Sequence, residues 1–77
     1  MKRYWMMNDE YEFIEVQQHE YEYELLDDGT SLINNGIIAN IFEDSILWDV
    51  QFGNVHGSDI ALLNKLVQTI EAKYGLA

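Results

Sequence analysis

Residues 45–75, SILWDVQFGNVHGSDIALLNKLVQTIEAKYG, change from the hydrophobic period of a β-strand to that of an α-helix. Successive side chains of a strand point to opposite faces of a sheet, so every second residue shares one face. In residues 45–52 the residues on one such face are all large and apolar: Ile46, Trp48, Val50 and Phe52. We therefore predict a strand here, with these four side chains directed into the core.

After a loop over residues 52–58, the apolar side chains recur at spacings of three and four, which is the period of one helix face. The residues of this face are Ile60, Leu63, Leu66, Val67, Ile70 and Tyr74. Ser58 or Asp59 can cap the start of the helix, and Gly75 can adopt the left-handed conformation that ends it. These signals predict a helix over about residues 59–74.

The segment before residue 45 contains one further clear strand. Residues 36–42, GIIANIF, form an apolar run, and the three residues 43–45 are short enough for a hairpin connection. The sequences DDG at 27–29 and NNG at 34–36 are turn signals, because Asn, Asp and Gly tolerate positive φ. Residues 30–34 between them are predicted as one short strand.

Residues 10–26, EYEFIEVQQHEYEYELL, fit two patterns. Rings and β-branched residues at every second position favour two strands, over about residues 10–16 and 20–26. The same rings also fall near heptad spacing, which leaves a helix as the alternative. We prefer the two strands, with a bulge or turn near residues 17–18.

Together these elements predict a single small acidic domain, residues 1–77, of the α+β class. We expect an antiparallel β-meander of four to six short strands packed against one C-terminal α-helix, in two layers. The N-terminal residues Tyr4, Trp5, Met6 and Met7 belong either to the core or to an exposed patch suited to recognition.

Charge is the most informative property of the composition. Fourteen acidic residues face four basic ones, for a formal net charge of −10, and residues 4–64 contain no Lys or Arg. Phosphates are repelled by such a surface, so direct binding of nucleic acid is disfavoured, whereas a basic protein is attracted. We therefore expect a basic protein partner, for example a nucleic-acid-binding enzyme or complex.

Nine of the fourteen acids lie in the first 28 residues. Alternate residues of a strand are about 6.8 Å apart, close to two steps of about 3.4 Å between the phosphates of a DNA strand. A carboxylate row could thus imitate a nucleic acid, with aromatic side chains as the anchors of the interface. The predicted partner-binding residues are Glu10, Glu12, Glu15, Glu20, Glu22, Glu24, Asp27, Asp28, Tyr21, Tyr23 and Trp5. The alternative is that these glutamates form the ordinary solvent-facing side of a sheet.

No motif in the sequence indicates a reaction. Cysteine is absent, and His19 and His56 are too far apart in sequence to suggest a zinc site. The serines lack a nucleophile-elbow context, and GNVHG at 53–57 lacks the pattern of a phosphate loop. We therefore predict no catalytic residue, no metal site, no cofactor and no enzymatic activity.

In size, charge and lack of catalytic motifs, the chain resembles the small acidic inhibitors of phages and mobile elements, a likeness of class that carries over no residue. That class includes anti-CRISPR proteins, antirestriction DNA mimics and nuclease immunity proteins. The resemblance implies inhibition of a basic, nucleic-acid-handling partner, as in phage counter-defence. The alternatives are a homodimeric assembly module and an immunity protein for a basic nuclease toxin. With no signal peptide or apolar span in the sequence, we expect a cytoplasmic location, in the host cell if the protein is phage-encoded.

Overall fold

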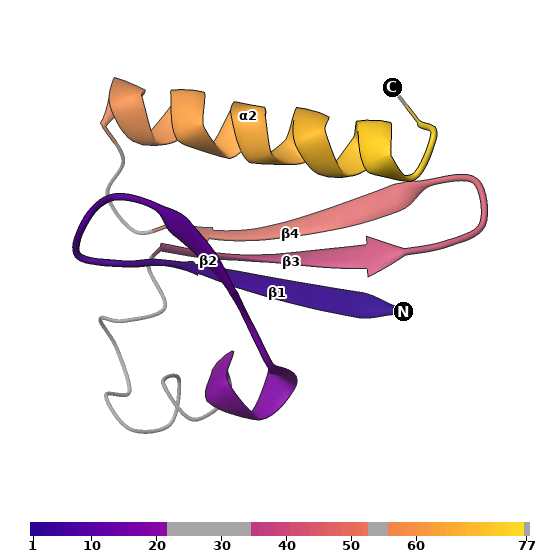
Figure 1. The fold of residues 1–77 in the computed structure, drawn as a ribbon, viewed down its shortest axis with the longest axis horizontal. Helices are drawn as coiled ribbons and strands as arrows, with labels where there is room; N and C mark the ends of the chain where they lie inside the picture. The colour runs from indigo at the N-terminus through magenta and orange to yellow at the C-terminus, as the bar shows by residue number, and fades with distance from the viewer. Residues whose placement is uncertain (22–34, 53–55, 77) are drawn as a thin grey trace.

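In the described part of the chain, one antiparallel sheet packs against one long helix (Figure 1). The computed structural model describes residues 1–21, 35–52 and 56–76. Its elements are the strands β1 (Lys2–Met7), β2 (Phe13–Val16), β3 (Asn35–Ile41) and β4 (Ile46–Phe52) and the helix α2 (Gly57–Lys73). The predicted α+β class is confirmed, with four antiparallel strands in one sheet and a C-terminal helix.

The strand order in the sheet is β2-β1-β3-β4. Two hairpins, β1–β2 and β3–β4, are joined by antiparallel pairing of β1 with β3, in which Tyr4 lies opposite Ile38 and Trp5 opposite Ile37. The sheet therefore departs from a simple meander at the connection from β2 to β3. The sequence left the placement of residues 4–7 open; they belong to β1, an inner strand.

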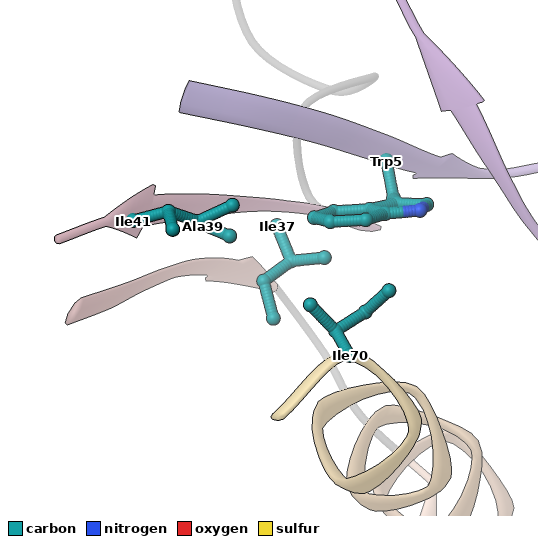
Figure 2. Packing of buried hydrophobic residues seen from close by; sticks show 5 residues of the cluster. All are labelled: Trp5, Ile37, Ala39, Ile41 and Ile70. Atoms are coloured by element: carbon teal, nitrogen blue, oxygen red, sulfur yellow. The ribbon is translucent and has the colours of Figure 1, made fainter. Parts of the chain in front are cut away.

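The core lies between α2 and the sheet face that it covers. Trp5, Ile37, Ala39 and Ile41 are buried on the sheet side, and Ile70 is buried on the helix side. Figure 2 shows Ile70 pointing from α2 toward Ile37 and Trp5. The residues packed around this cluster are Phe13, Ile46, Trp48, Leu63, Leu66, Val67 and Tyr74. Ile46 and Trp48 thus point into the core, as predicted.

Two residues expected in the core are considerably exposed. Val50 is 44% exposed because β4 is an outer strand of the sheet, and Ile60 is 48% exposed in the first turn of α2. The rest of the predicted helix face, from Leu63 to Tyr74, packs as expected. The hydrophobic layer is therefore narrower than the periodicity of the sequence suggests.

The helix α2 begins two residues before its predicted start. His56 is the N-cap, and its backbone N–H donates to Asp59 Oδ2 at 3.0 Å, so Asp59 acts as the third helical residue of a capping arrangement. At the other end Gly75 has a φ of 74°, as predicted for the residue that ends the helix. Within the described part of the chain, no helix has both the length and the apolar character needed to cross a bilayer.

Residues 18–21 form a helical turn, so the predicted strand over residues 20–26 is wrong at residues 20 and 21. The backbone N–H groups of Glu20 and Tyr21 donate to the carbonyl oxygen of Gln17, and Glu20 Oε1 accepts from the Gln17 N–H at 3.0 Å. This local capping arrangement stabilises a helical start where the alternation of rings and acids suggested a strand. The predicted strand over residues 30–34 and the remainder of 20–26 lie outside the described residues.

Tyr21 packs on the sheet face opposite α2. Its ring centroid is 5.4 Å from that of Tyr4, and its hydroxyl donates to Gln51 Oε1 at 2.6 Å. The ring passes so close to Gly36 that a Cβ there would lie 2.6 Å from the Tyr21 hydroxyl oxygen. Glycine at position 36 is therefore what lets this ring approach the backbone of β3 so closely.

Candidate binding surface

The loop between β1 and β2, residues 8–12, is held in shape by the side chain of Asn8. Asn8 Oδ1 accepts the backbone N–H groups of Glu10 and Glu12, each at 2.9 Å. The Asn8 N–H donates to the carbonyl oxygen of Glu12 at 2.9 Å, and the Tyr11 N–H donates to that of Asn8 at 3.1 Å. Four hydrogen bonds over five residues fix the backbone of this segment, which we name the Asn8 loop.

The Asn8 loop presents three carboxylates to solvent. Asp9, Glu10 and Glu12 are all exposed, and none of them forms an ion pair with another described residue. Because the loop backbone is fixed by Asn8, these charges are held near one another without neutralisation. The loop is thus a preorganised source of negative potential.

Tyr11 lies in the same loop and has an unusual backbone conformation. Its φ is 60°, in the left-handed region that bulky residues rarely adopt, and its side chain is 68% exposed. Strained residues of this kind are frequent at functional sites, where surrounding contacts hold them in place. Here the hydrogen bonds of Asn8 hold an aromatic ring out toward solvent.

A groove of about 290 Å³ lies between this ring and α2. Its lining residues are Tyr11, Glu12, Phe13, Leu62, Lys65, Leu66 and Thr69. Phe13, Leu62 and Leu66 are only half-buried, so apolar side chains form much of its walls. We refer to it below as the Tyr11 groove. An apolar groove therefore lies directly beside the acidic loop, with Glu12 in its lining.

The bases gather mostly at a different site, around Glu15. Arg3 donates to both carboxylate oxygens of Glu15, at 2.8 Å from Nε and 2.5 Å from Nη2, and its Nη1 donates to the Tyr74 hydroxyl at 3.2 Å. The guanidinium also lies 5.2 Å from the ring centroid of Trp5. A second, polar pocket of about 410 Å³ borders this cluster and includes Lys2 in its lining.

The contacts within this cluster shift the pKa values of Glu15 and Arg3. The hydrogen bond from Arg3 holds the pKa of Glu15 below its usual range, and the positive charge of Lys73 acts in the same direction. The hydrogen bond to Glu15 likewise raises the pKa of Arg3. Glu15 is therefore an ionised carboxylate whose charge is offset by Arg3, and the ion pair links β2 to β1.

The residues predicted to bind a partner are separated by the fold. Glu10 and Glu12 are exposed in the Asn8 loop, Glu15 is in the ion pair, and Glu20 caps the helical turn. They do not form the straight rows that strands would give. Glu22, Tyr23, Glu24, Asp27 and Asp28 lie outside the described residues.

The expected aromatic anchors also differ from those that the structure exposes. Trp5 is 4% exposed and Tyr21 is 2% exposed, so both belong to the packed interior and neither presents its ring to a partner. Tyr11 was not among the predicted site residues. The turn-forming pair Asn8-Asp9 after the apolar run of residues 4–7 was the signal that could have placed Tyr11 in a loop.

Within residues 1–21, 35–52 and 56–76, no three His, Asp or Glu side chains are grouped in a way that could hold a metal ion. Comparison of the chain with protein-family models, with curated proteins and with solved structures found no match. The charge, exposure and shape of the described surface are therefore the features that indicate a function.

Proposed function

We propose that the protein is a non-enzymatic binding protein that inhibits a basic, nucleic-acid-handling partner by occupying its positively charged site. The observation that carries the proposal is the acidic end of the molecule formed by the Asn8 loop. Three exposed carboxylates lie there without ion pairs among the described residues, in a chain of net charge −10. A phage counter-defence protein, such as an anti-CRISPR or antirestriction protein, is the biological role that fits this activity.

Electrostatics supports this reading in two ways. Complementary charge accelerates association with a cationic surface, and the same negative charge repels nucleic acid itself. Electrostatic attraction of this kind does not require regularly spaced carboxylates. Glu20 in particular accepts a hydrogen bond from the Gln17 backbone N–H and is not part of a carboxylate row among the described residues. Competition with nucleic acid would arise because both ligands require the same basic groove of the partner.

The test is a pull-down from a bacterial host lysate with two charge-matched variants. Asp9→Asn, Glu10→Gln and Glu12→Gln together remove three charges from the Asn8 loop. Glu43→Gln, Asp44→Asn and Asp49→Asn remove three exposed charges elsewhere. Capture of a nucleic-acid enzyme should weaken in the first variant and persist in the second.

Two further readouts make the outcome decisive. Capture should fall between about 0.05 M and about 0.5 M NaCl, because screening shortens the range of the attraction, and an excess of oligonucleotide should displace the captured enzyme. Equal weakening in both variants would reduce the interaction to net charge alone. Capture that is insensitive to salt and to oligonucleotide would contradict the proposal.

A homodimeric assembly module is the second candidate, and the outer strand β4 favours it. Among the described residues β4 pairs only with β3, and its side chains include Leu47, 65% exposed, and Val50, 44% exposed. Unpaired strand edges with few charges readily add another strand. Sedimentation should then show a dimer that strengthens with salt and is lost in Leu47→Lys, the opposite salt dependence from that of a cationic partner.

A further inference from the structure

We infer that the Tyr11 groove receives one apolar side chain of a cationic protein segment whose neighbouring Lys or Arg contacts the carboxylates of the Asn8 loop. This inference rests on the proposed function and names the surface and the partner chemistry for it. Its basis is the position of an apolar groove directly beside unpaired carboxylates, with Glu12 belonging to both.

The groove has the size and walls of a site for a single side chain. Its volume of about 290 Å³ is at the lower limit of small-molecule sites. Leu62 and Leu66 are half-buried on the α2 side, and Phe13 is half-buried on the β2 side. An inserted aliphatic group would remove apolar surface of all three from water, which is the dominant favourable term in association.

Tyr11 is the residue that shapes the rim. Its ring is 68% exposed although its φ of 60° disfavours any residue with a side chain. Glycine would relieve this strain, so stability alone does not account for tyrosine at the position. Tyrosine is enriched at the centres of protein interfaces, where its rigid ring gives contact area at little entropic cost.

The charges around the groove define the partner. Asp9, Glu10 and Glu12 lie on the loop side, and Lys65 lies on the α2 side of the rim. A bound segment should therefore carry its base toward the loop and no base toward Lys65. A second copy of this chain would bring further negative charge to the loop, and an anionic membrane surface would be repelled.

The experiment uses two synthetic peptides of equal positive charge whose lysines all lie on one side of the central residue, which is leucine in one peptide and serine in the other. The proteins are the wild type, Tyr11→Gly, and Phe42→Ala as a control that removes a ring 58% exposed at the β3–β4 turn. Binding is measured by calorimetry at about 150 mM NaCl. Methyl chemical shifts of the leucines locate the contact.

We expect the leucine peptide to bind wild type and Phe42→Ala about tenfold more tightly than the serine peptide, as burial of one aliphatic side chain predicts. Leu62 and Leu66 methyl shifts should move only with the leucine peptide. In Tyr11→Gly the two peptides should bind nearly equally, while thermal stability is unchanged or raised because glycine accepts the positive φ.

The outcomes separate this inference from the proposed function. Equal affinity of the two peptides for the wild type, with salt-dependent binding of both, would overturn the groove and leave the acidic surface in place. Loss of leucine preference in Phe42→Ala as well as in Tyr11→Gly would also overturn it. Absence of salt-dependent binding by either peptide would count against the proposed function itself.

Discussion

Tyr21 holds the helical turn of residues 18–21 on the sheet face opposite α2. Its side chain is 2% exposed, and it contacts Tyr4, Gln51 and the bare backbone of Gly36. Burial raises the pKa of its phenol to about 12, and the negative charge of Asp49 adds to that effect. Tyr21, which the sequence predicted to contact a partner, thus packs inside the protein and attaches the helical turn to the sheet.

This pKa shift predicts how stability changes in alkali. An unfolded tyrosine ionises near pH 10, whereas Tyr21 in the fold stays protonated until about pH 12. The contribution of Tyr21 to the free energy of unfolding is therefore fully present below about pH 10. It falls by about 2 to 3 kcal/mol as the pH rises from about 10 to about 12. Urea unfolding at increasing pH, compared with Tyr21→Phe, is the measurement.

Tyr21→Phe gives a matched control because it keeps the ring and removes only the ionisable group. It loses the hydrogen bond to Gln51, which costs about 1 kcal/mol at neutral pH. The stability difference between the two proteins should then shrink and change sign in alkali. Parallel pH profiles would show that Tyr21 does not titrate differently in the fold.

At the scale of elements, β4 and α2 were predictable from the sequence because each carries a complete periodic signal, and β3 was predictable because its apolar run is followed by a short hairpin connection. The alternation of residues 45–52 and the three-four spacing after residue 59 are long enough to exclude the competing period. Their observed bounds, Asn35–Ile41, Ile46–Phe52 and Gly57–Lys73, differ from those expected by a few residues at most.

The N-terminal elements were harder because local hydrogen bonds decide them. Residues 4–7 are apolar without interruption, as suits an inner strand, and so they carry no alternation to recognise. The carboxylate of Glu20 and the amide of Asn8 each cap nearby backbone N–H groups, which turns residues 18–21 and 8–12 away from strand. Side chains of this kind override alternation over short distances, which is why Glu10, Glu12 and Glu20 lie outside regular strands.

A mutation at the start of α2 can test which residue caps the helix. The sequence offered Ser58 or Asp59 as the cap, and in the structure Asp59 accepts a hydrogen bond from the N-cap residue His56. Asp59 is 7% exposed and accepts the His56 N–H, while Ser58 is exposed and makes no comparable contact among the described hydrogen bonds. Asp59→Ala should lower the free energy of unfolding by about 1 kcal/mol, and Ser58→Ala by less than about 0.5 kcal/mol. Urea denaturation of both variants measures this, and equal effects would contradict the assigned cap.

At the scale of the whole molecule, charge is distributed unequally. Arg3, Glu15 and Lys73 act on one another near the start of β1 and the end of α2, whereas the Asn8 loop lies at the opposite end of the elongated molecule (Figure 1). The three exposed carboxylates of the Asn8 loop therefore lie away from this cluster of bases, in a chain of net charge −10. Self-repulsion of this kind destabilises a compact state.

Screening that repulsion should stabilise the fold. We expect NaCl, raised from about 20 mM to about 500 mM, to increase the free energy of unfolding by about 1 kcal/mol, or the melting temperature by about 4 to 8 °C. Sulfate is unsuitable because it strengthens hydrophobic burial regardless of charge. The variant with three neutralised loop residues should respond less, and a melting temperature that falls with NaCl would contradict the expectation.

The strand order has a consequence for how the protein is made. The buried cluster combines Trp5, Ile37 and Ile70, which are contributed by the beginning, the middle and the end of the chain. A nascent polypeptide that has been synthesised only as far as residue 56 has no helix α2 to cover the tryptophan, and β1 cannot gain its inner neighbour until β3 has been synthesised. The native interior therefore forms only after Ile70 has been synthesised, and a fragment that stops before α2 would lack it.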